Sequence, residues 1–142
     1  MNGSPKITVV DTSIAAKWVL HSEQDAQHAR SLLQAHLREA VTLCAPSLLL
    51  WELANLMRYK ASFTPSDADA AVQSVIDLRI WLIEPLPWLV RRAVSVAYQT
   101  GITAYDAAFV ALALELECPF ITADQRLADK IHSDNVRLLS QL

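Results

Sequence analysis

The sequence predicts an α/β protein with a short, mainly parallel central sheet of about four to five strands and helices on both faces. Short apolar runs rich in β-branched residues, such as Ile7-Thr8-Val9-Val10, alternate along the chain with longer segments of helical periodicity. Glycine occurs only at Gly3 and Gly101, while alanine and leucine are frequent, and both facts favour helices. Alternating strands and helices indicate a parallel sheet, because each helix returns the chain across one of its faces.

The strands are bounded by residues that interrupt apolar runs. The first strand, residues 7–10, stops at the polar residues Asp11-Thr12-Ser13, which can cap a following helix. The second is closed by Pro46, and the third precedes Pro85. The later strands are expected at residues 41–45, 81–84, 120–122 and 136–138.

The helices follow from hydrophobic spacing and capping residues. In residues 23–40 one face is expected to point inward: Ala26, Ala29, Leu32, Leu33, Leu37 and Ala40. In residues 67–80 the inward residues are Ala71, Val75, Ile76 and Ile80. Ser47 is expected to cap the very apolar helix that follows it. Helices are therefore predicted at about residues 14–20, 23–40, 48–59, 67–80, 87–100, 104–117 and 124–132.

Composition limits the classes of protein to consider. A chain of 142 residues with 53% hydrophobic residues fits a single domain, residues 1–142, and excludes a disordered protein. A net charge of −3 argues against a broad surface that coats nucleic acid, but a nuclease needs only a local basic rim. Cys44 and Cys118 lie in apolar surroundings and are interpreted as reduced core residues, so a cytoplasmic protein without a signal peptide or membrane span is expected.

Two aspartates follow predicted strands directly. Asp11 comes after Val9-Val10, and Asp124 follows the strand at 120–122. Taken singly, each is better explained as a helix cap than as a ligand. Ligands in open parallel sheets bind beyond the carboxyl ends of the strands, and a parallel sheet could bring these two ends together.

Two further carboxylates begin or interrupt apolar helices. Asp106 lies three residues after Thr103, which has the spacing of a capping box, although Asp is a shorter partner than Glu or Gln. Glu52 stands in an apolar helix with no wide polar face, so its charge must be paired, neutralised or bound to a metal. Four such acids suit a hard cation with oxygen ligands, and Mg²⁺ is the expected ion.

The motifs around these acids resemble those of the PIN-domain ribonucleases, and most closely the VapC-type toxins of toxin–antitoxin pairs. The resemblance spans nearly the whole chain, and its four motifs occur in the family's order. They are VVDTS at residues 9–13, the stretch from Pro46 to WELAN at 51–55, TAYDAA at 103–108, and ITAD at 121–124.

The resemblance implies a three-layer PIN-like fold and a metal-dependent endoribonuclease that hydrolyses RNA with Mg²⁺, or Mn²⁺ as a substitute. It implies Asp11, Glu52, Asp106 and Asp124 as the catalytic and metal-binding acids. Supporting hydroxyls would come from Thr12, Ser13 and Thr122. It further implies a homodimer and a small cognate antitoxin as partners. A fifth acid found in some members has no clear equivalent, and Asp129 is a weak candidate.

Other interpretations remain open. A phosphoacceptor domain would need paired acids after the first strand and a late lysine, and a haloacid-type phosphatase would need an acid where Ser13 stands. Two glycines cannot build a phosphate-binding loop. The serious alternative is a catalytically inactive PIN-like module that binds RNA or protein. The four tryptophans and the helix at 48–57 belong to the core by default, and a dimer interface would explain part of them equally well.

Overall fold

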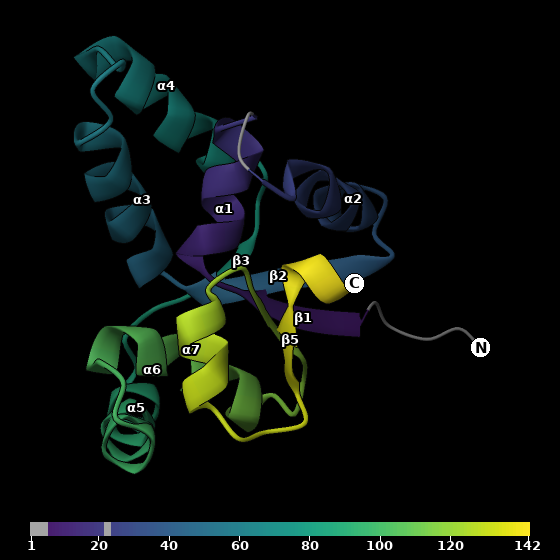
Figure 1. The fold of residues 1–142 in the computed structure, drawn as a ribbon, viewed down its shortest axis with the longest axis vertical. Coiled ribbons are helices and arrows are strands. Elements are labelled where there is room, and N and C mark those ends of the chain that lie inside the picture. Colours follow the sequence, from purple (N-terminus) through teal and green to yellow (C-terminus); the bar gives the residue numbers. More distant parts are fainter. Residues whose placement is uncertain (1–5, 22–23) are drawn as a thin grey trace.

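Five parallel strands form one sheet in the order β3-β2-β1-β4-β5 (Figure 1). The structure is a computed structural model, and it describes residues 6–21 and 24–142. β1 (Lys6–Val10) lies at the centre, between β2 (Val41–Pro46) and β4 (Phe120–Thr122). β3 (Trp81–Ile83) and β5 (Val136–Leu138) form the two edges. The predicted parallel sheet is confirmed, and each strand lies within two residues of its predicted position.

The helices form layers on both sides of this sheet (Figure 1). On one side lie α1 to α4, and on the other lie α5 and α6, with α7 beside β4 and β5. The helices are α1 (Thr12–Val19), α2 (Ala26–Leu37), α3 (Leu48–Arg58), α4 (Pro65–Ile76), α5 (Pro87–Thr100), α6 (Ala104–Glu115) and α7 (Gln125–Lys130), and a 3₁₀ turn covers Leu139–Gln141. The predicted three-layer α/β fold is therefore confirmed.

The core forms where the central strands meet α6. Val9 and Val10 are fully buried, because both faces of β1 are covered by helices. The helix α6 is buried almost all round, and Phe109 and Leu112 lie deep in the core. Through this packing α6 contacts β1, β2 and β4.

For two helices, the sequence predicted more inward-facing residues than the structure buries. α2 ends at Leu37, which is 60% exposed, because Glu39 adopts a left-handed φ of 63° and turns the chain toward β2, leaving Ala40 exposed as well. The predicted helix start at Glu23 lies outside the described residues.

The second correction concerns the helix predicted over residues 67–80. α4 ends at Ile76, which is 45% exposed, and the left-handed φ of 55° at Arg79 separates the helix from β3. Val75 and Ile80 are buried as predicted. Ser47 occupies the N-cap position of α3, but its side chain makes no capping hydrogen bond, so that prediction was wrong.

The tryptophans do not all belong to the core. Trp18 is buried and donates from Nε1 to the carbonyl of Ala29 at 2.9 Å. Trp51, Trp81 and Trp88 are 77%, 45% and 43% exposed, so the default core interpretation was wrong for them. Both cysteines are buried and free, as predicted. Within the described part of the chain, no helix is long and apolar enough to cross a bilayer.

Candidate active site

The site lies at the carboxyl ends of the two central strands. β1 and β4 are paired in parallel, with Val10 opposite Ile121, so the residues that follow them leave the sheet side by side. Asp11 then caps α1, and Asp124 caps α7 through a hydrogen bond from the backbone N–H of Leu127 at 3.1 Å. The capping interpretation of both acids is correct, but capping is not the only interaction that each acid makes.

Asp11 is buried, and both of its carboxylate oxygens are held by hydrogen bonds. Oδ1 accepts from the backbone N–H of Ser13 at 3.1 Å and from the Ser13 hydroxyl, and Oδ2 accepts from the Thr122 hydroxyl at 2.5 Å. Burial raises the pKa of Asp11 to about 6, although these donors favour the charged form, and the nearby charge of Asp124 adds to the rise. A carboxylate with a raised pKa and a fixed orientation is suited to binding a cation.

The hydroxyls of Ser13 and Thr122 join the two strand ends. Ser13 Oγ accepts from the backbone N–H of Ala123 at 2.9 Å, and Thr122 Oγ1 accepts from the backbone N–H of Asp124 at 3.0 Å. Each hydroxyl therefore donates to Asp11 and accepts from the chain that carries Asp124. The contacts fit the supporting role that the resemblance implies for them.

Glu52 reaches the same region from α3. Its Oε1 accepts from the hydroxyl of Thr12 at 2.6 Å, so a hydroxyl on the first turn of α1 is the partner that an isolated acid in an apolar helix requires. Partial burial raises the pKa of Glu52, and the charge of Asp106 raises it further. The hydrogen bond from the Thr12 hydroxyl lowers the pKa of Glu52, but it offsets only part of this rise.

Asp106 lies on the first turn of α6, and its carboxylate is not used for capping. Thr103 Oγ1 accepts from the backbone N–H of Asp106 at 3.0 Å, but the reciprocal bond of a capping box is not formed. Burial raises the pKa of Asp106, and the charge of Asp124 adds to it. The capping-box interpretation was thus wrong, because the Asp106 carboxylate does not accept from the backbone N–H of Thr103, and the residue lines the cleft.

The four acids line one cleft of about 220 Å³ and will be called the acid quartet. The cleft is lined by Asp11, Thr12, Ser13, Glu52, Leu56, Asp106, Phe109 and Asp124. Electrostatic repulsion links Asp11 to Asp124, Asp124 to Asp106, and Asp106 to Glu52. The quartet therefore forms a continuous chain of like charges, and a cation in the cleft would relieve it.

The donor set fits a hard divalent cation. Among the described residues, no three His, Cys, Asp or Glu side chains converge into a ready-made metal-binding group. Mg²⁺ is usually bound by one or two carboxylates together with waters and substrate phosphate, so a wide, oxygen-lined cleft accommodates it. That all four acids bind the ion directly stays a prediction.

Two apolar residues of the cleft were missed in the sequence. Leu56 lies four residues after Glu52, and Phe109 lies three residues after Asp106. Helical spacing alone would have placed each beside its acid. Asp129 accepts a hydrogen bond from Gln125 at 2.7 Å and does not line the cleft, so it is not the fifth acid.

The chain is similar in sequence to a known family of proteins. The family model described as PIN domain matches residues 8–131. Ribonuclease VapC3 of Pyrobaculum aerophilum is 29% identical over 126 residues, which cover 86% of this chain and 92% of that protein.

Solved structures share the fold at lower identity. A chain of the DNA-bound VapBC structure from Salmonella typhimurium superposes with a TM-score of 0.72 at 14% identity, covering 95% of this chain and 98% of that one. The sarcin-ricin loop cleaving toxin VapC20 of Mycobacterium tuberculosis gives a TM-score of 0.68 at 14% identity, covering 89% and 97%. At these identities the likeness shows the fold.

Proposed function

The chain belongs to the PIN-domain family, and on this basis we propose that it is a metal-dependent endoribonuclease that hydrolyses phosphodiester bonds of RNA. We propose further that it is the toxin of a type II toxin–antitoxin pair and acts in the cytoplasm. The observation that carries the proposal is the acid quartet: four carboxylates from four separate segments line one cleft at the carboxyl end of the sheet. Ribonuclease VapC3, which this chain matches over 92% of that protein's length, supports RNA as the substrate.

The residues of the cleft divide the work between them. A bound Mg²⁺, or Mn²⁺ in its place, would supply positive charge at the scissile phosphate and lower the pKa of an attacking water. Asp11 would hold the ion, because its oxygens are fixed by Ser13 and Thr122. Asp106 and Asp124 would complete the acidic wall, and Glu52, held by Thr12, would accept a proton or orient water.

Cleavage of RNA with and without metal tests the proposal. Purified protein should cut single-stranded RNA with Mg²⁺ or Mn²⁺, and EDTA should abolish the cut. The Asp11→Asn variant should lose most activity and remain folded, because the substitution removes a charge and no core volume. Cleavage that persists in excess EDTA would contradict the metal-dependent mechanism, and RNA binding without any cleavage would favour the inactive module.

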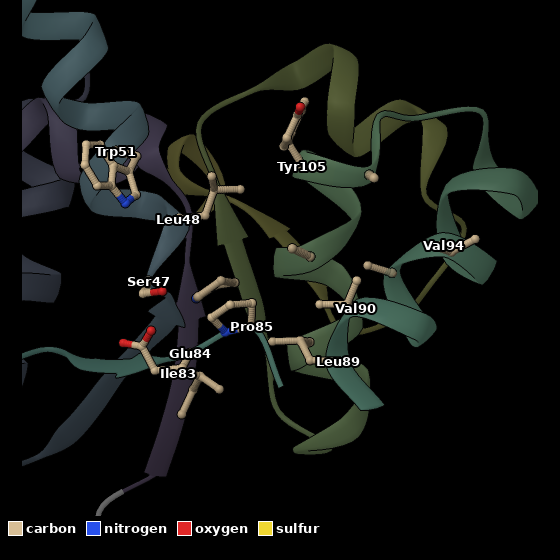
Figure 2. Close-up of a pocket in the computed structure, with 14 residues that line it drawn as sticks. Ser47, Leu48, Trp51, Ile83, Glu84, Pro85, Leu89, Val90, Val94 and Tyr105 are labelled. Carbon is tan, nitrogen blue, oxygen red and sulfur yellow. The ribbon is translucent and has the colours of Figure 1, made fainter. Parts of the chain in front are cut away.

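The proposed partners are an antitoxin and a second copy of the chain. One solved structure of this fold is a toxin–antitoxin complex from Klebsiella pneumoniae, which supports a small antitoxin here. An apolar groove of about 430 Å³ between α3, β3, α5 and α6 supports the dimer (Figure 2). It is lined by exposed residues, among them Trp51 at 77% and Val90 and Val94 at 47% each. An exposed apolar surface of this kind is typical of an interface.

Light scattering tests the dimer. We expect a particle of about 32 kDa, twice the 15.8 kDa chain, and we expect Val90→Glu with Val94→Glu to give monomers. The control is Leu37→Glu on α2, which introduces the same charge at an apolar residue that is 60% exposed on the other side of the sheet. A wild-type monomer at tens of micromolar, or a control that dissociates equally, would contradict this interface.

A further inference from the structure

The acid quartet creates an electrostatic problem for its own substrate. RNA carries a negative charge at every phosphate, and the residues that line the quartet's cleft include four carboxylates and no cation. The apolar groove beside α3 is also lined by an acid, Glu84, and by no cation. A metal ion accounts for the scissile phosphate, but the neighbouring phosphates need positive charge from the protein.

A second cavity supplies that charge on the opposite side of Asp106 and Asp124. It has a volume of about 140 Å³ and is lined by Gly101, Ile102, Thr103, Asp106, Asp124, Arg126, Leu127 and Lys130. Asp106 and Asp124 line both this cavity and the quartet's cleft. The two cavities therefore share a wall, and an RNA strand that passes through one cavity can continue into the other.

Arg126 and Lys130 stand four residues apart on α7 and so share one face of the helix. Lys130 interacts electrostatically with Asp106, which shows that its charge reaches the shared wall. Within residues 6–21 and 24–142, neither cation forms a salt bridge, in contrast to Arg92, which pairs with Glu115 at 3.0 Å. Both side chains are also exposed, so both can contact a ligand.

The position of α7 is fixed independently of any ligand. Its first turn is capped by Asp124, and Leu127, between the two cations in sequence, is 5% exposed and packs into the core. The acid that lines the cleft thus also holds the helix that carries the cations. A rigid support of this kind keeps a binding group at a constant distance from the reacting bond.

We propose that Arg126 and Lys130 form a binding site for a backbone phosphate of the RNA that lies next to the scissile one. The inference rests on the proposed ribonuclease function and assigns a direction to the substrate, from the acid quartet across Asp106 and Asp124 to α7. Arginine and lysine both bind phosphate, and two cations on one phosphate offset the repulsion from the quartet. The site recognises the backbone and not a base, so its contribution is independent of sequence.

The test compares Arg126→Gln/Lys130→Gln with the control Arg30→Gln/Arg38→Gln. The control removes the same charge from exposed positions at α2, on the other side of the sheet. For cleavage of single-stranded RNA with Mg²⁺, we expect KM to rise about tenfold in the first variant and kcat to change little. The slope of log KM against log salt should fall by about 0.7, the value for one phosphate contact to a single strand. The charge-conserving variant Arg126→Lys/Lys130→Arg should keep KM close to the wild-type value.

Binding of fluorescent single-stranded RNA to the Asp11→Asn protein, with and without the two substitutions, separates this inference from the proposed function. If the wild type cleaves no RNA but α7 substitution still weakens RNA binding and its salt dependence, the phosphate site stands and the ribonuclease proposal fails. If cleavage is normal and the α7 variant matches the α2 control in KM and salt slope, the phosphate site is wrong. Thermal melting identifies any variant that is not folded.

Discussion

The first turns of α4 and α6 have the same local sequence pattern and different structures. The N-cap of α4 is Thr64, three residues before Asp67, and the N-cap of α6 is Thr103, three residues before Asp106. In both, the threonine hydroxyl accepts from the backbone N–H of the aspartate, at 3.1 Å and 3.0 Å. Only at α4 does the aspartate complete the box, accepting from the backbone N–H of Thr64 at 2.9 Å.

The difference shows what separates a capping acid from a site acid. Hydrogen bonds from Thr64 hold the pKa of the fully exposed Asp67 below its usual value. Burial and the neighbouring Asp124 raise the pKa of Asp106, and they outweigh the lowering by the Thr103 hydroxyl and by the charge of Lys130. One acid stabilises its helix, whereas the other is kept in the cleft at a cost in stability, which is the pattern expected of a functional group.

Removing each acid's charge tests this contrast most directly. Asp106→Asn should lower kcat for RNA cleavage by about a hundredfold to a thousandfold, the loss expected when a charged group of a catalytic site is removed. Asp67→Asn should leave cleavage unchanged. Both variants should give the folded far-UV spectrum of the wild type. Equal activity of the two variants would show that Asp106 is a capping residue like Asp67.

The pH dependence of stability should differ in sign between the two kinds of acid. Because the pKa of Asp11 is raised from 3.8 to about 6, the native metal-free protein binds more protons than the unfolded chain between these values. The free energy of unfolding should therefore increase as pH falls from about 7 towards about 4, by up to about 3 kcal/mol from this group over the whole interval. Asp67 acts oppositely, since its contribution is lost as pH falls through its lowered pKa. Denaturant titration in EDTA at several pH values measures the free energy of unfolding, to which both groups contribute.

Two variants separate these contributions. Asp11→Asn should stabilise the metal-free protein at pH 8 and flatten the dependence between pH 7 and 5. Asp67→Asn should leave that interval unchanged and alter the curve only at lower pH. An Asp11→Asn protein that is less stable than the wild type at pH 8 would mean that Asp11 contributes as a cap and not as a strained site acid.

Added Mg²⁺ should distinguish the quartet from the capping acid by stability alone. At a concentration about 100 times its dissociation constant, the ion should stabilise the wild type by roughly 2.7 kcal/mol at pH 7. The gain should be smaller at pH 5, because protons compete for the same oxygens. Asp67→Asn should respond like the wild type and Asp106→Asn less. A melting temperature indifferent to millimolar Mg²⁺ would argue against an ion in the cleft.

The smallest expected effect concerns the feature that the two helices share. Thr64→Ala and Thr103→Ala each remove one hydroxyl that accepts from the third residue of its helix. Each should lower the free energy of unfolding by about 1 kcal/mol. This corresponds to a decrease of about 3 °C in melting temperature for a chain of this size. A much larger loss from Thr103→Ala would indicate that Thr103 has a second role.

The sequence by itself determined the elements and the parallel character of the sheet, whereas the strand order came from the structure. β-branched apolar runs ended by polar residues, as at Val9-Val10-Asp11, are local signals, and each predicted strand was found. α5 was placed at its observed bounds because Pro87 and Gly101 mark its start and end. The four acids stood out by their neighbours in sequence, and the resemblance of their motifs to those of the PIN-domain ribonucleases implied them as one site.

Only the tertiary structure decided what each of these side chains does. The Thr-x-x-Asp pattern is identical at α4 and α6, and burial beside Asp124 makes the second aspartate a cleft residue. The bonds from Thr12 to Glu52 and from Thr122 to Asp11 join residues 40 and 111 positions apart, so no local pattern contains them. Exposure of Leu37, Ile76 and Trp51 likewise depends on what packs beside them. Hydrophobic periodicity shows which face of an element is apolar, whereas the neighbour that covers that face is set by the whole fold.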